Sequence, residues 1–200
     1  HCYNLTGGPI LGPNVTDMSY AYCGCNITGS PICSDKIINM KYAYYGCNNI
    51  TGTPVCGNNV TDMSYSYYLC NNIIGPPVCG PNVTDMSNAY YECRKLTGSP
   101  VCGPNVTNMD LAYRGCDKIT GNPVCGDKVT TMRLTYQNCS LTGSPVCGDN
   151  VTSMDGTYYQ CWKLTGSPVC GNKVTDMDST YLRCGNLTGS PVCGPNVTTM

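Results

Sequence analysis

Apolar residues recur along the chain with one long, fixed period. The nine methionines are spaced by 22 or 23 residues, from Met18 to Met200, and none lies elsewhere. The unit that begins at Leu96 reads LTGSPVCGPNVTNMDLAYRGCDK. Its copies begin at Leu5, Ile27, Ile50, Ile73, Leu96, Ile119, Leu141, Leu164 and Leu187. Such a period predicts a solenoid, in which each short unit buries its apolar face only by stacking on its neighbours.

Comparison of the copies separates the expected core from the surface. Val or Ile always occupies the sixth and eleventh positions, Met the fourteenth, and a small residue followed by Tyr the seventeenth and eighteenth. Gly is always third and Pro always fifth, which marks a corner before an extended run such as Pro100-Val101-Cys102. Because Pro lacks the N–H that a sheet ladder needs, it fits only the start of a strand. We therefore expect one short strand per unit, with irregular or short 3₁₀ return arms.

The unit resembles a known repeat. Leu-Thr at its start, Val-Thr in its middle, Met-x-x-x-Tyr, and Cys-x-x-Leu across the junction are similar to the BspA-like leucine-rich repeat, with the pattern L-T-x-I-x-I-P-x-x-V-T-x-I-x-x-x-A-F-x-x-C. Gly-Ser-Pro-Val-Cys stands where that family has its Ile-x-Ile strand. The resemblance runs through the whole chain. It implies surface-exposed proteins of bacteria and protists, some of them adhesive, and no enzyme.

The expected fold class is a repeat solenoid. It would be a leucine-rich-repeat-like right-handed coil with short parallel β-strands, one per 22–23-residue repeat. Residues 1–200 would form a single solenoid of about nine repeats, as part of a longer array. A solenoid of this kind needs polar caps to stay soluble as a monomer, and the end repeats here show none.

Composition narrows the function. Charged residues make up 12% of the chain and the net charge is −1, so neither nucleic acid nor an anionic membrane is attracted electrostatically. We find no apolar run that would cross a membrane and no signal peptide. The single histidine, His1, and recurring surface carboxylates such as Asp17 and Asp62 offer no distinct acid–base pair. We therefore expect no enzyme, no cofactor, no nucleic-acid partner and no membrane insertion.

Cysteine is the second strong signal, with 18 residues, and most lie at the seventh or twenty-first position. The disulfide candidates are Cys2, Cys23, Cys25, Cys33, Cys47, Cys56, Cys70, Cys79, Cys93, Cys102, Cys116, Cys125, Cys139, Cys147, Cys161, Cys170, Cys184 and Cys193. Their density favours disulfides in an oxidising compartment, while buried reduced thiols are the alternative.

Two disulfide pairings stay open. Each twenty-first cysteine could bond the seventh of the next copy, as in Cys25–Cys33, with Cys2 left for Cys23. Alternatively, the bond could close within one copy, as in Cys33–Cys47. A structural zinc site needs clustered cysteine pairs, and the only close pair is Cys23 with Cys25, so we expect no metal.

Asparagine sequons are the third signal. Possible N-glycosylation sites, each in Asn-x-Thr or Asn-x-Ser, are Asn4, Asn14, Asn26, Asn49, Asn59, Asn82, Asn105, Asn138, Asn150, Asn186 and Asn196. The alternative is that these side chains bond the local backbone at corners of the coil. Tyr is present 16 times and Phe never, which suggests that the tyrosine hydroxyl reaches a partner or the rim of the coil.

Two function classes remain. A recognition solenoid would vary the outward strand face, yet the second residue is Thr in eight of the nine copies. This uniformity favours a non-catalytic structural protein, a stalk, spacer or filament building block. It would lie outside the cell, on a cell surface or on a virion surface, with itself end to end or neighbouring repeats as partner. The alternative is an adhesin or ligand-binding module that recognises a glycan or another surface protein through many weak, equivalent contacts.

Overall fold

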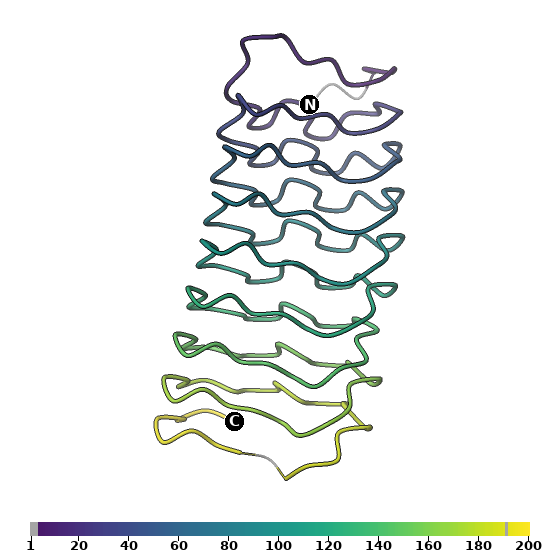
Figure 1. Cartoon of the computed structure of the whole chain (residues 1–200). Helices are drawn as coiled ribbons and strands as arrows, with labels where there is room; N and C mark the ends of the chain where they lie inside the picture. Colours follow the sequence, from purple (N-terminus) through teal and green to yellow (C-terminus); the bar gives the residue numbers. More distant parts are fainter. Residues whose placement is uncertain (1–3, 191) are drawn as a thin grey trace.

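The computed structural model describes residues 4–190 and 192–200. Successive copies of the repeat lie one above another in a column, with the amino-terminal coils at one end and the carboxyl-terminal coils at the other (Figure 1). Within these residues no helix and no multi-residue strand forms. The regular pairings are isolated parallel bridges between residues one copy apart, such as Asp62 with Asp85 and Asp85 with Asn108.

The expected fold class is therefore wrong. The described chain is not a leucine-rich-repeat-like solenoid with a parallel strand in each repeat, because Pro100-Val101-Cys102 and its equivalents form no strand. Among the described residues, no sheet joins the copies, and single bridges take its place. Two features of the backbone hydrogen bonding explain the difference.

The first feature is a pair of hydrogen bonds made by the tyrosine at the eighteenth position of each repeat. The Tyr113 hydroxyl donates to the carbonyl oxygen of Val101 at 2.7 Å and accepts the N–H of Val101 at 3.1 Å. A parallel strand would need both backbone groups for its neighbours, and Pro100 has no N–H to offer. The same pair of bonds joins Tyr22 to Ile10, Tyr44 to Ile32, Tyr67 to Val55, Tyr90 to Val78, Tyr136 to Val124, Tyr158 to Val146 and Tyr181 to Val169. The expected partner of the hydroxyl is thus confirmed.

The second feature is an alternation of hydrogen bonds after the methionine. Every second N–H between Met40 and Gly46 reaches the next copy, as in Tyr42 N–H to Ser64 O at 3.0 Å. The intervening N–H groups of Ala43 and Tyr45 fold back by three residues, as in Ala43 N–H to Met40 O at 2.9 Å, whereas the Lys41 N–H donates to Asn39 Oδ1 at 2.9 Å. The segment is therefore a six-residue turn. Such turns occupy residues 19–24, 41–46, 64–69, 87–92, 110–115, 133–138, 155–160 and 178–183.

Each of these turns requires left-handed backbone at its second and sixth residues. Glycine supplies it at Gly46 and Gly156, but Tyr65 and Leu69 adopt φ of 57° and 59° in the turn 64–69. For a non-glycine residue, this conformation costs about 1–2 kcal/mol of conformational energy. Packing between copies must offset that cost.

Six positions of the repeat form the core. In one central copy they are Leu96, Val106, Met109, Ala112, Tyr113 and Cys116, all 0% exposed. The interior tyrosines stack from copy to copy, with ring centroids 5.6 Å apart between Tyr90 and Tyr113 and 5.8 Å apart between Tyr113 and Tyr136. The predicted burial of the methionine and tyrosine positions is confirmed through the central copies.

The sixth position was expected in the core and is not part of it. Val101 is only half-buried, whereas Ile10 and Val192 in the end copies are 85% and 54% exposed. The neighbouring proline is buried instead, as at Pro100. Because successive side chains of an extended run point to opposite sides, burial of the fifth residue turns the sixth outward.

Glycine at the eighth position allows close contact between copies. A Cβ atom on Gly103 would lie 2.9 Å from the Cys79 sulfur and 2.9 Å from the Gly80 carbonyl oxygen, both in the preceding copy. Real Cβ atoms do not approach other atoms so closely. The distance between these two copies therefore depends on the absence of a Cβ atom at Gly103.

Candidate functional site

One face of the column carries two ranks of polar side chains. Asn or Lys occupies the tenth position of the repeat and Thr or Ile the twelfth, on either side of the eleventh residue. Val83, at an eleventh position, is 0% exposed. Because alternate residues of an extended segment point to opposite sides, Asn82 and Thr84 flank it on the surface. Successive copies repeat this pair along the column.

The threonine rank has a fixed hydrogen-bonding pattern. Thr107 donates its backbone N–H at 2.9 Å and its hydroxyl at 3.1 Å to the carbonyl oxygen of Thr84. Thr84 makes the same two bonds to Thr61, at 2.8 Å and 3.1 Å. Each hydroxyl hydrogen is therefore used inside the column. The lone pairs of the hydroxyl oxygen still accept hydrogen bonds.

The asparagine rank is anchored in a similar way. The side-chain nitrogen of Asn82 donates to the carbonyl oxygen of Asn58 at 2.9 Å, and that of Asn105 donates to Pro81 at 2.9 Å. One amide N–H of each side chain is thus held by the preceding copy. A second N–H and a carbonyl oxygen complete each amide.

An open trough of about 710 Å³ lies between the two ranks. Three complete pairs line its middle: Asn59 with Thr61, Asn82 with Thr84, and Asn105 with Thr107. Lys36 and Ile38 line one end and Lys128 the other. We call this feature the Asn–Thr trough and take it as the candidate functional site. The sequence predicted Asn59, Asn82 and Asn105 as sequons or as side chains that bond the local backbone, and it did not predict the trough.

The sequon asparagines fall into two groups. Asn59, Asn82, Asn105, Asn150 and Asn196, at the tenth position, donate their amide nitrogen to a carbonyl of the preceding copy. Asn4, Asn26, Asn49, Asn138 and Asn186 are exposed near the start of a copy, and Asn14 is exposed in the first copy. The first group therefore bonds the backbone, but that of the preceding copy and not the local backbone that the alternative interpretation expected. Glycosylation stays a prediction.

No disulfide joins the described cysteines, so the expected network is not present in this structure. The 16 cysteines from Cys25 to Cys193 are free thiols, and Cys2 lies outside the described residues. The two series have different partners: the Cys116 thiol donates to the carbonyl oxygen of Tyr90 at 2.9 Å, whereas the Cys33 sulfur accepts the N–H of Gly57 at 3.2 Å. The structure thus agrees with the alternative of reduced thiols.

Burial favours the protonated form of Cys161 and Cys56. It raises the pKa of Cys161 to about 12 and that of Cys56 to about 11, from an ordinary value of 9.0. Because the thiolate is the nucleophile and the metal ligand, such groups are poorly reactive near neutral pH. Within the described residues, no group of three or more His, Cys, Asp or Glu side chains is placed to hold a metal ion.

The recurring carboxylates bond the backbone. The side chain of Asp85 accepts the N–H of Ser87 at 2.8 Å, which closes a turn at the thirteenth position. The equivalent bond from the Ser19 N–H lowers the pKa of Asp17 below its ordinary value. These aspartates thus begin the six-residue turns.

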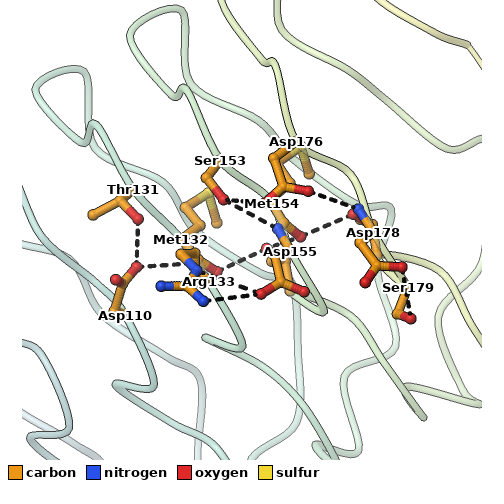
Figure 2. A network of polar contacts seen from close by, with 12 residues as sticks. Asp110, Thr131, Met132, Arg133, Ser153, Met154, Asp155, Asp176, Asp178 and Ser179 are labelled. Atoms are coloured by element: carbon orange, nitrogen blue, oxygen red, sulfur yellow. Dashed lines mark hydrogen bonds and ion pairs between the residues drawn. The ribbon is translucent and has the colours of Figure 1, made fainter. Parts of the chain in front are cut away.

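In the copy where threonine replaces this aspartate, a polar network supports the turn instead (Figure 2). Thr131 replaces the aspartate, and Asp110 of the preceding copy accepts both the Arg133 N–H at 2.8 Å and the Thr131 hydroxyl at 2.5 Å. Arg133 also pairs with Asp155 at 3.2 Å. An exposed ion pair contributes at most about 1 kcal/mol. The network therefore serves the turn geometry rather than a distinct site.

The surface tyrosines gather in the first half of the chain. Tyr20, Tyr42 and Tyr65 stack with centroids 4.7 Å and 4.4 Å apart, and Tyr68 and Tyr91 belong to a second stack, 4.5 Å apart. Because the ring faces cover one another, mainly ring edges and hydroxyls remain for contacts. Desolvation and neighbouring tyrosines raise the pKa of Tyr42 to about 12.

Comparison of the chain with protein-family models, curated proteins and solved structures finds no match. The resemblance to the BspA-like repeat therefore stays a prediction from the residues. Among the described residues, no helix is long and apolar enough to cross a membrane.

Proposed function

We propose that this chain is a non-catalytic structural module, a spacer, stalk or filament building block. The observation that supports this function is the continuity of bonding from copy to copy. Met86 N–H reaches Asn108 O at 3.0 Å on one side of the coil, and Thr107 N–H reaches Thr84 O at 2.9 Å on another. Equivalent bonds recur along the column, so a load along its axis is shared by many parallel bonds.

We place the module outside a cell or on a virion surface. This location rests on the resemblance to surface-exposed repeat proteins and on the low content of charged residues, 12%. The cysteines no longer contribute to the proposal, because the argument for an oxidising compartment required disulfides.

The partner that we propose is a neighbouring repeat or a second copy of the chain, bound end to end. Exposed apolar side chains mark both end coils, with Ile10 85% exposed at one end and Val192 and Met200 54% and 73% exposed at the other. Leu182, Val192 and Met200 surround a hollow of about 300 Å³. Contact between unlike ends does not close on itself and favours filaments.

Electron microscopy and sedimentation of the purified chain test this function. We expect rod-shaped particles whose length increases with concentration, and Val192→Glu should keep them short because it places a charge in the end contact. Ile74→Glu, at an apolar side chain that is 50% exposed in an interior copy, is the matched control. Globular particles would contradict the structural role, whereas rods that stay single at every concentration would contradict only the end-to-end partner.

A second candidate function is a ligand-binding module. The Asn–Thr trough favours it, because three equivalent polar pairs border one continuous hollow. The two functions are compatible, since a stalk can carry a binding face.

A further inference from the structure

We propose that the Asn–Thr trough binds a linear, uncharged, polyhydroxylated polymer, a neutral glycan chain lying along the column. Three matching pairs, centred on Asn82 and Thr84, border the trough. This inference rests on the ligand-binding candidate and does not depend on the stalk function.

The hydrogen-bonding groups of each pair match those of a sugar. Thr84 uses its hydroxyl hydrogen on the Thr61 carbonyl, so its oxygen faces a ligand as an acceptor. Asn82 uses one amide hydrogen on the Asn58 carbonyl, which leaves a second donor and a carbonyl acceptor. A sugar hydroxyl both donates and accepts, and can therefore satisfy both kinds of group. The internal bonds also fix both side chains before binding, which reduces the entropy lost on association.

The middle of the trough favours an uncharged ligand. Its three complete pairs carry no ionisable group, and its two lysines lie at its ends. The Lys128 ammonium donates to Asn105 Oδ1 at 2.6 Å, and Lys36 donates to the Pro13 carbonyl at 2.7 Å. Both ammonium groups keep their charge, but they flank the three central pairs, so an anionic polymer would gain charge contacts only at the two ends of the trough.

The repetition of the pairs favours a polymer over a single sugar. Neighbouring copies are joined by backbone bridges, which space their chains by about 4.8 Å. Each unit of a chain lying along the trough would meet the same two side chains as the unit before it. Weak contacts to three linked pairs add up, whereas a monosaccharide engages only one.

Titration calorimetry with cellohexaose, mannohexaose and chitohexaose tests the proposal, with glucose and polygalacturonate as comparison ligands. The decisive variant is Thr84→Val, which removes the central hydroxyl while keeping the side-chain shape. Thr152→Val is the matched control, because the Thr152 hydroxyl makes the same bond, to the Thr130 carbonyl at 3.0 Å, and lies outside the trough. Both variants lose one internal bond, and their unfolding midpoints should therefore shift alike.

We expect at least one hexasaccharide to bind and glucose not to bind measurably. Thr84→Val should weaken hexasaccharide binding by about tenfold. This change corresponds to the loss of roughly one hydrogen bond between the protein and the ligand. Thr152→Val should leave the affinity within about twofold of the original. The proposal is overturned if no hexasaccharide binds, if both variants weaken binding equally, or if polygalacturonate binds more tightly than every neutral chain.

Discussion

At the residue scale, the choice of tyrosine over phenylalanine has a structural cause. The ring of Tyr113 packs in the core, while its hydroxyl holds both backbone groups of Val101, at 2.7 Å and 3.1 Å. Phenylalanine would fill the same volume but would leave the Val101 N–H and carbonyl without this partner. Such groups are costly when they are partly buried.

We expect Tyr113→Phe to lower the free energy of unfolding by about 1–3 kcal/mol, because two hydrogen bonds to a half-buried backbone are lost. Urea unfolding followed by circular dichroism measures the change. Tyr159→Phe is the control. Tyr159 directly follows the interior Tyr158 of another copy, is half-buried, and does not bond the backbone of a sixth-position residue through its hydroxyl. Equal stability of Tyr113→Phe and the parent chain would show that the hydroxyl pair contributes nothing.

At the scale of the single coil, the sequence predicts the interior better than the backbone. Nine copies within one chain reveal which positions keep their character, and Met and Tyr at those positions are buried. The strand prediction failed because it treated Pro100-Val101-Cys102 as a local signal. The group that occupies the Val101 backbone comes from Tyr113, twelve residues later. Propensity within a short window does not include such a bond.

The trough was missed for a related reason. The sequence predicted an inward valine with Asn and Thr on either side of it, as a sequon or as residues that bond the local backbone. It did not predict that Thr84 and its equivalents bond the preceding copy, which aligns the pairs along the column. The prediction of disulfides also depended on how the two cysteine series lie relative to each other. Spacing along the chain does not reveal that the two series have different hydrogen-bond partners.

The glycine at the eighth position gives a prediction about contact between coils. We expect Gly103→Ala to destabilise the chain by about 1–3 kcal/mol, because its new methyl group would overlap the Cys79 sulfur and the Gly80 carbonyl in the preceding coil. Gly185→Ala is the control, since a Cβ atom there meets nothing within 4 Å. Thermal unfolding compares the two, and similar melting temperatures would mean that the coils separate easily.

The two cysteine series give a second prediction at this scale. In the native protein, we expect a thiol reagent such as iodoacetamide to modify the exposed Cys193 first and to leave the fully buried Cys116 unmodified. Unfolding should make both equally reactive. Mass mapping of labelled peptides provides the measurement. Early labelling of Cys116 under native conditions would show that the coils open, and an unlabelled Cys193 after unfolding would indicate a disulfide.

At the scale of the whole molecule, many weakly acidic side chains lie in one core in their neutral form. Tyrosines and thiols from successive copies lie in continuous rows, and burial raises the pKa of Cys79, Cys125 and Cys161 to about 12 each. A raised pKa in the folded state means that this state resists ionisation while the unfolded chain does not. The stability linked to these groups is therefore complete below their unfolded pKa, near 9.0, and is lost as the pH rises through the folded values.

We accordingly expect the column to unfold in alkali more steeply than a protein with one buried thiol would. Each such group reduces the free energy of unfolding by about 1.4 kcal/mol per pH unit between its unfolded and folded pKa, and the contributions of similar coils add. Urea midpoints measured from about pH 7 to about pH 11 should stay level to about pH 8.5 and then fall. Cys125→Ala removes one group and should make the fall shallower, even if it also lowers the starting stability. A midpoint that stays level to pH 11 would contradict the burial of the thiol rows, since only thiols already exposed to water, or already bonded to one another, would leave folding independent of pH in that range.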